Sequence, residues 1–252
     1  MLGLGVAKKK FSASNVAPCA SASPAPSRAE LRNATFAYAQ RGCEAGCDVV
    51  EFHQVGEDRL VFMLLDVAGD RAAGSPLAAG VAAAFQQHAA VLFAAADLNQ
   101  AEALTNLAML LNRAVMSEGR VRCAAAFLGC FDAQTGALWY VNAGHTPALV
   151  HDGTNTELRA TGVPFGLFSH AIHEAQVTVL DVPSAFLLIS KGLTEMGGRR
   201  REFGLAGAKN VITERAANAQ QLCAAVLDAA DTFAGSRNLR QQDRTAVALV
   251  RQ

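Results

Sequence analysis

Asp66 is the residue whose surroundings most clearly suggest chemistry. It follows six apolar residues, 60–65, and a strand that is apolar throughout is usually covered on both faces. Glycines 69 and 74 allow a tight turn after it, and Ser75-Pro76 is a suitable N-cap and first helical residue. A carboxylate at the end of a buried strand, beside a helix start, suits a hard cation or a phosphate. The open alternative is that Asp66 only caps the turn.

A second carboxylate, Asp48, opens a predicted strand over residues 48–54. A turn at 56–58 returns the chain into the strand that ends at Asp66, so the two strands are predicted to form a hairpin. This hairpin brings Asp48 and Asp66 within reach of each other.

Polar residues also flank two other apolar strands. Lys191-Gly192 follow the strand predicted at 185–190, and Gln242-Asp243 stand just before the strand predicted at 245–250. Lys191 is either a simple charge at a sheet end or an ion-pair partner of Asp66, and the ion pair is the more attractive alternative.

The composition describes a globular chain of balanced charge. Its 252 residues are 51% hydrophobic, and 22 basic residues balance 22 acidic ones, so nothing global indicates nucleic acid or an anionic membrane as a partner. No apolar run reaches the roughly 18 residues of a spanning helix, and no apolar segment follows Lys8-Lys9-Lys10 as in a signal peptide.

Six cysteines in a chain too large to need disulfides predict a reducing, cytoplasmic location. Cys43 and Cys47 could share a metal, but no second pair or histidine cluster completes a zinc site.

The chain divides into a flexible tail or linker over residues 1–30, rich in Ala, Ser and Pro, and one domain over 31–252. Apolar periodicity and turn residues predict many short strands and two groups of helices, which together indicate an α+β layered domain. The predicted strands are 31–40, 48–54, 59–65, 121–131, 137–143, 147–151, 156–159, 174–180, 185–190 and 245–250, and the predicted helices are 76–96, 99–116 and 216–233. Residues 193–196 are predicted as a loop or short helix.

Five segments, in order, resemble the PPM family of metal-dependent protein serine/threonine phosphatases, in the SpoIIE-type branch of sporulation and sigma-factor regulators. That branch typically shows Gly-Gly-Asp-x-Tyr-Asp, Gly-Asp-Val-Ser-Gly-Lys-Gly, Asn-Ala-Gly-His-x-Pro, Thr-Asp-Gly-hydrophobic-Thr-Glu and Asp-Asp-x-Thr. The matching segments here are 46–51, 65–71, 142–147, 190–195 and 242–245, and the resemblance covers roughly residues 35 to 250.

The resemblance implies a four-layer α-β-β-α sandwich of two antiparallel sheets flanked by helices. It also implies a centre of two Mn²⁺ or Mg²⁺ ions that activates a water against phosphoserine or phosphothreonine. Carried over to this chain, Asp66 is the bridging carboxylate, the Val67 carbonyl is a ligand of the first metal, and Asp48 is an accessory carboxylate.

Two expected carboxylates of the second metal are replaced. Lys191 stands where the family has Asp in Thr-Asp-Gly, and Gln242 stands at the first Asp of Asp-Asp-x-Thr, although Asp243 could shift in to compensate. Cys47, Leu65 and Arg71 replace family glycines, and Glu51 replaces an Asp. These changes predict at most one weakly held ion, and an ammonium of Lys191 held among Asp48, Glu51 and Asp66 in place of the second.

Two functions from different classes follow. One is a phosphatase with weak or lost hydrolysis of a phosphoprotein, such as an anti-sigma-factor antagonist. The other is a pseudophosphatase that binds a phosphoprotein or regulates a partner, and the alanine-rich helices over 76–116 are a possible homodimer contact. Neither a nucleic acid nor a membrane is expected as a partner.

The remaining candidate residues have simpler interpretations. His145 is expected to be a hydrogen-bonded structural residue and not a base. His170 and His173 have a spacing that suits a metal but are expected to be solvated, as is the basic segment 199–201.

Overall fold

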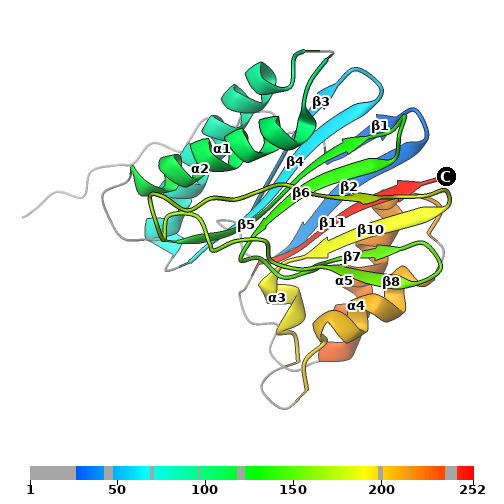
Figure 1. Ribbon diagram of the computed structural model, residues 1–252. Coiled ribbons are helices and arrows are strands. Elements are labelled where there is room, and N and C mark those ends of the chain that lie inside the picture. The colour runs from blue at the N-terminus through cyan, green and yellow to red at the C-terminus, as the bar shows by residue number, and fades with distance from the viewer. Residues whose placement is uncertain are drawn as a thin grey trace, which may run out of the picture.

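The computed structural model describes residues 27–42, 48–68, 71–95, 97–117, 123–197, 201–214, 216–235 and 243–252, with the backbone alone described over 71–75. Its strands form two antiparallel sheets, and helices cover the outer face of each, so the four layers run α-β-β-α (Figure 1). The predicted α+β sandwich is confirmed.

The first sheet has the strand order β1-β2-β11-β10-β7-β8. Its strands are β1 (Arg28–Leu31), β2 (Ala34–Arg41), β7 (Ala148–His151), β8 (Asn155–Leu158), β10 (Ser184–Ile189) and β11 (Arg244–Arg251). Three helices belong to this side of the molecule: α3 (Lys191–Thr194), α4 (Gly204–Ile212) and α5 (Ala219–Ala234).

The second sheet has the order β3-β4-β5-β6-β9. Its strands are β3 (Asp48–Val55), β4 (Arg59–Val67), β5 (Ala124–Asp132), β6 (Ala137–Ala143) and β9 (Gln176–Val179). The alanine-rich helices α1 (Arg71–Leu92) and α2 (Gln100–Met116) lie over its outer face (Figure 1).

The centre of the core is aromatic. Phe62 of β4 is fully buried, and its ring centroid lies 5.3 Å from that of Phe36, 6.3 Å from Phe127 and 5.6 Å from Phe186, so both sheets contribute. A Cβ at Gly129 would lie 2.3 Å from the Phe62 ring, which explains why strand β5 carries a glycine there. The sequence pattern of alternate large apolar residues is therefore what holds the two sheets together.

Several predicted boundaries differ from the structure. The helix predicted to start at Pro76 begins at Arg71, so Pro76 lies inside α1, in its second turn. The single strand predicted over 31–40 is two strands, β1 and β2, and β1 begins at Arg28. Helix α4 was not predicted, because Gly204 and Gly207 conceal an apolar spacing that includes Ala208, Val211 and Ile212.

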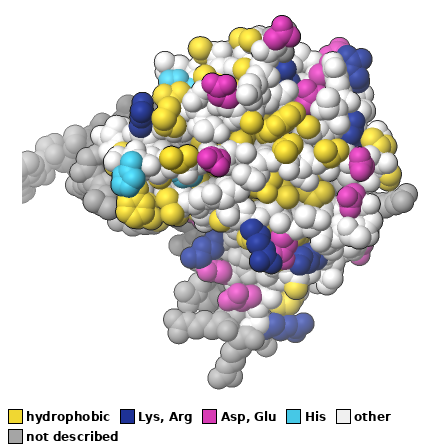
Figure 2. Space-filling model, in the orientation of Figure 1, with side chains coloured by type: hydrophobic (Ala, Val, Ile, Leu, Met, Phe, Trp, Pro, Cys, Tyr) yellow, Lys and Arg dark blue, Asp and Glu magenta, His cyan; other side chains and the backbone are white. Residues whose placement is uncertain are grey.

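The molecular surface is mixed in charge. Figure 2 shows acidic and basic side chains interspersed on one face, together with hydrophobic ones. Some of the exposed apolar residues belong to the edge strand β9, where Val177 is 58% exposed. In the part of the chain that is described, no helix is both long and apolar enough to cross a bilayer.

We expect Phe62→Ala to lower the free energy of unfolding by about 3–5 kcal/mol, because it leaves a cavity at the contact of both sheets. Denaturant unfolding measures this, with Val177→Ala as the exposed control, for which the change should stay within about 0.5 kcal/mol. Equal effects of the two substitutions would contradict this account of the core.

Candidate active site

The candidate site is built on two aspartates that the hairpin places side by side. Asp48, the first residue of β3, and Asp66, near the end of β4, are direct cross-strand partners, which confirms the predicted proximity. Both side chains point between the sheets, because they share the strand face of Val50 and Leu64, two residues of the inter-sheet core. The site therefore lies at one open end of the sandwich.

The other sheet contributes two strand ends to the same place. Strand β10 ends just before Ser190 and Lys191, and β11 begins just after Asp243. The two ends are joined because the Ser190 amide donates to the Thr245 carbonyl at 2.9 Å, and the Thr245 amide donates to Ser190 Oγ at 3.1 Å. Ser190 is completely buried, so this junction is part of the fixed frame of the site.

Asp48 is held by hydrogen bonds from the other sheet. Thr245 Oγ1 donates to Asp48 Oδ2 at 2.7 Å, and Gln40 Nε2 contacts both Thr245 Oγ1, at 3.1 Å, and the Asp48 carbonyl, at 3.2 Å. The Asp48 amide donates to Asp243 Oδ2 at 3.4 Å. Residues 40 and 245 carry no charge and were not singled out from the sequence; Thr245 could have been found as the Thr of the fifth motif.

The electrostatics of the site favour a cation. Burial, and then the charge of Asp66, raises the pKa of Asp48 to about 7, although hydrogen bonds from Thr245 and Ser190 oppose the shift. Burial also raises the pKa of Asp66, the positive charge of Lys191 lowers it, and Asp243 raises it again. Burial thus disfavours the ionised form of both carboxyl groups, and a bound cation would favour it.

Lys191 does not sit among the three carboxylates as predicted. Its Nζ lies 3.5 Å from Glu195 Oε1, and the side chain is 66% exposed; this is the ion pair that Lys191 makes within the described residues. Its charge nevertheless acts on Asp66 through space. The predicted replacement ion pair is therefore wrong as a direct contact.

Glu51 does not belong to the site. Side chains alternate along β3, so Glu51 faces helix α1, where Gln86 Nε2 donates to its Oε2 at 2.5 Å. The predicted cluster of Asp48, Glu51 and Asp66 is wrong because residues 48 and 51 point to opposite faces of one strand.

The turn after β6 is hydrogen-bonded to the end of β10, which borders the site. Asn142 Oδ1 accepts from the His145 amide at 2.8 Å, and Thr146 Oγ1 donates to the Ile189 carbonyl, at the end of β10. His145 is buried, and burial lowers its pKa to about 4, so it is neutral at ordinary pH. The structural role expected for His145 is confirmed. Gly144 has φ of +71°, and a Cβ there would lie 2.6 Å from the Pro164 ring.

The other candidates lie elsewhere. His173 was expected to be solvated but is buried, because its ring packs against Phe165 and its Nε2 lies 2.8 Å from the Val163 carbonyl. His170 is exposed, as expected. Gln242, the cysteine pair at 43 and 47, and arginines 199 and 200 lie outside the described residues.

The two aspartates supply donors that suit a hard cation. Asp48 and Asp66 supply largely buried carboxylate oxygens of the kind that Mn²⁺ and Mg²⁺ prefer, and their raised pKa values mark negative charge that a cation would stabilise. Over the described ranges, no group of three or more His, Cys, Asp or Glu side chains is arranged to hold a metal. The ligand roles of Asp48, Asp66, the Val67 carbonyl and Asp243 stay predictions.

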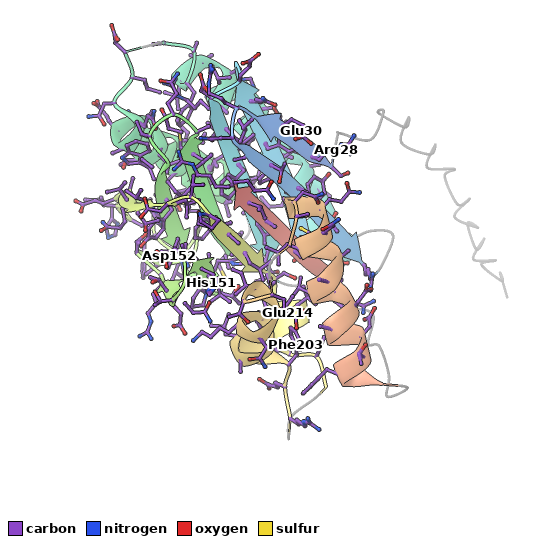
Figure 3. The ribbon with its side chains drawn as sticks, turned by 90° about the vertical axis from the view of Figure 1, so that its right-hand side faces the viewer. Arg28, Glu30, His151, Asp152, Phe203 and Glu214 are labelled. Carbon is purple, nitrogen blue, oxygen red and sulfur yellow. The ribbon has the colours of Figure 1, made fainter. Side chains whose placement is uncertain are left out.

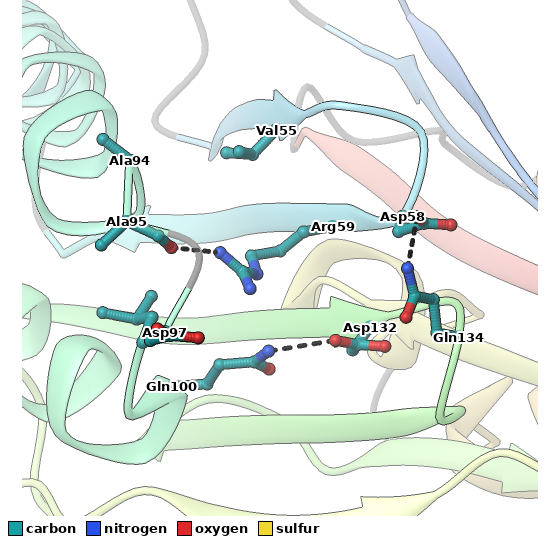
Figure 4. Close-up of a pocket in the computed structure, with 10 residues that line it drawn as sticks. Val55, Asp58, Arg59, Ala94, Ala95, Asp97, Gln100, Asp132 and Gln134 are labelled. Atoms are coloured by element: carbon teal, nitrogen blue, oxygen red, sulfur yellow. Dashed lines mark hydrogen bonds between the residues drawn. The ribbon is translucent and has the colours of Figure 1, made fainter.

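Two pockets lie away from this end of the sandwich. One, of about 660 Å³, is at the β3–β4 turn, where Arg59 donates to the Ala95 carbonyl at 3.1 Å and Gln100 donates to Asp132 at 3.1 Å (Figure 4). The other, of about 560 Å³, is bordered by His151, Asp152 and Glu214, three of the residues labelled in Figure 3. Neither pocket includes Asp48 or Asp66.

Comparison with known proteins agrees with this geometry. A family model described as Stage II sporulation protein E (SpoIIE) matches residues 56–252. The chain therefore belongs to the SpoIIE family. Solved structures that are similar to it include a PPM Ser-Thr phosphatase from Mycobacterium smegmatis. A search among curated proteins gives no match.

Solved structures share the fold at low sequence identity. The phosphatase domain of SpoIIE from Bacillus subtilis, with a regulatory fragment, has a TM-score of 0.71 at 13% identity, covering 88% of this chain and 64% of that one. The RsbU and RsbW domains of a Mycobacterium tuberculosis protein have a TM-score of 0.70 at 22% identity, covering 90% and 62%. RsbX in complex with magnesium has a TM-score of 0.65 at 12% identity, covering 89% and 98%. The chain thus spans less than two thirds of the first two structures.

The ionisation of Asp48 should be visible in stability. Its pKa is about 7 in the folded protein against an ordinary 3.8, so without metal the Asp48 contribution to the free energy of unfolding is full below about pH 4 and is lost as the pH rises through 7. We expect Asp48→Asn to lack this loss and, at about pH 8, to be more stable than wild type by up to about 4 kcal/mol.

Denaturant unfolding in chelator across this pH range makes the measurement. His145 has a lowered pKa and gives the opposite trend in acid, but both proteins contain it, so the difference between them isolates Asp48. Asp181→Asn, at an exposed position, is the matched control and should follow wild type. Parallel pH profiles of wild type and Asp48→Asn would show that Asp48 ionises normally.

Proposed function

We propose that this chain is a phosphoprotein-directed PPM-type phosphatase domain whose metal-dependent hydrolysis is weak or lost. The observation that supports this is the positive charge of Lys191, which acts through space on the Asp66 carboxylate, at a position where the family's motif has an acidic ligand. The proposed location is the cytoplasm.

The proposed metal site consists of Asp66, the Val67 carbonyl and Asp48, with Asp243 nearby. A bound Mn²⁺ or Mg²⁺ supplies a water of lowered pKa and neutralises phosphate charge. Asp48 is kept in place for such an ion by Thr245. A unit charge of like sign about 4 Å from a divalent ion costs on the order of 8 kcal/mol at an effective dielectric of 20, so Lys191 opposes a second ion unless its long side chain moves away.

A second candidate function is phosphoprotein binding without turnover. It is favoured by the exposure of Lys191, whose side chain is 66% accessible and whose ion pair with Glu195, at 3.5 Å, is loose enough to be exchanged for a phosphoryl oxygen. The proposed partner in either case is a phosphorylated protein such as an anti-sigma-factor antagonist. A homodimer through α1 and α2 is part of the same proposal.

A phosphatase assay tests whether hydrolysis is weak or lost. We expect turnover of an aryl phosphate or a phosphoprotein in Mn²⁺ to be near background and unchanged by Asp66→Asn, because one weak ion supplies little transition-state charge stabilisation. Efficient Mn²⁺-dependent turnover that Asp66→Asn abolishes would establish an active enzyme and overturn the proposal of weak or lost hydrolysis.

Restoring the family's carboxylates should restore metal binding. We expect Lys191→Asp combined with Gln242→Asp to gain thermal stability from Mn²⁺, by about 2.7 kcal/mol once the ion is at a hundredfold its Kd, whereas wild type gains little. Melting curves with chelator and with Mn²⁺ measure this.

Lys191→Gln combined with Gln242→Asp is the control, since it removes the positive charge without supplying the ligand at position 191. If wild type gains as much from Mn²⁺ as the restored double variant, Lys191 does not oppose the ion.

A further inference from the structure

Two arginines lie directly opposite each other behind the site. Arg41 ends β2 and Arg244 begins β11, and the two are cross-strand partners, so their like charges repel unless a carboxylate joins them. Asp231 of α5 does so: its Oδ2 accepts from Arg41 Nη1 at 2.7 Å, and its Oδ1 accepts from Arg244 Nη1. Asp228, one turn earlier, accepts from Arg41 Nη2 at 2.6 Å.

Asp231 and Asp228 differ in which arginine they pair with and in how exposed the pair is. Arg244 is only 8% exposed, and Asp231 is its ion-pair partner among the described residues. The Asp228 side chain is 67% exposed, and its ion-pair partner in the described part of the chain is Arg41. A buried guanidinium needs a carboxylate, whereas an exposed pair contributes little, so Asp231 is the essential member of the group.

The inner faces of the same two strand ends hold Asp48. Side chains alternate along a strand, so Arg41 and Arg244 point toward α5 while their neighbours Gln40 and Thr245 point between the sheets. Thr245 Oγ1 and Gln40 Nε2 make the hydrogen bonds that fix the Asp48 carboxylate and carbonyl, at 2.7 and 3.2 Å. The two arginines that Asp231 joins on the outer face are therefore the immediate chain neighbours of these donors on the inner face.

We propose that Asp231 is a positioning residue for Asp48, which acts by fixing the ends of β2 and β11 through Arg41 and Arg244. The inference deepens the proposed function and relies on it for the meaning of Asp48 in the site. Figure 3 shows α5 lying along the sheet that contains these strands, so a single helix side chain reaches both strand ends.

The attachment of α5 to the sheet does not explain why Asp231 pairs with both arginines. The apolar face of α5, with Leu222, Val226 and Ala230 fully or almost fully buried, packs on Ala246 and Ala248 of β11 and already secures the helix. Asp231 is added at the end nearest to Asp48, where an apolar contact could not join two opposed arginines.

The test uses the whole chain in chelator, with the carboxyl ¹³C resonance of Asp48 as the readout under conditions where Asp48 is ionised. Thr245→Val defines the displacement caused by losing the hydrogen bond to the carboxylate. We expect Asp231→Asn to displace the resonance in the same direction and by a comparable amount. Asp228→Asn, the matched control on the same helix, should leave it within the linewidth.

A purely structural Asp231 would give a different result: a lower melting temperature with the Asp48 resonance unmoved, which would overturn the proposal. If Asp231→Asn does not fold, Arg41→Gln opens only the β2 side and leaves the buried Arg244 pair intact. An unmoved Asp48 resonance in that variant would overturn the proposal equally.

A Mn²⁺ titration adds a functional readout. Where wild type binds Mn²⁺, we expect Asp231→Asn to weaken the affinity about tenfold, as loss of a supporting residue around a metal site does, and Asp228→Asn to leave it unchanged. Equal affinities of wild type and Asp231→Asn would overturn the positioning role. The resonance is measured without metal or turnover, so failure of the proposed function and failure of this inference remain separate outcomes.

Discussion

The site depends on the placement of two carboxylates side by side in a largely buried position. Asp48 and Asp66 are paired by the register of the β3–β4 hairpin, and burial raises the pKa of both. Like charges so placed repel each other and favour either a proton or a cation between them. Hydrogen bonds from the opposite sheet hold Asp48 of this unfavourable pair, and the large inter-sheet core offsets the free-energy cost of burying the two carboxyl groups.

Lys191 determines how that charge is balanced. Its ammonium lowers the pKa of Asp66 without contacting it and remains paired with Glu195 near the surface. The site therefore combines paired aspartates with an exposed positive charge that one divalent ion tolerates better than two do. This combination is the physical basis for proposing weak or lost hydrolysis in a chain that belongs to the SpoIIE family.

The sequence predicted the parts of the site that depend on local pattern. The hairpin, the buried strand before Asp66 and the strand ends at Lys191 and Asp243 follow from apolar runs and turn residues, which are properties of neighbours in the chain. The sequence predicted less reliably the sheet face to which each side chain points. Glu51 was grouped with Asp48, but two residues that are three positions apart on a strand point to opposite faces of the sheet.

Contacts between segments that are far apart in the chain could not be predicted from the sequence. Gln40 and Thr245 are separated by 205 positions, and nothing local indicates that they would meet at Asp48. The pairing of Arg41 with Arg244, and the position of Asp231 between them, likewise depends on strand order and on the docking of α5. The burial of His173 could not be predicted for the same reason, because the loop that encloses it takes its path from the fold.

The most direct measurement is a crystal structure of the protein grown in Mn²⁺, with the ions located by their anomalous scattering. The account predicts one partly occupied peak beside Asp48 and Asp66, and Lys191 without a second ion next to it. Two well-occupied peaks about 3.5–4 Å apart, the spacing of an active binuclear centre, would contradict it.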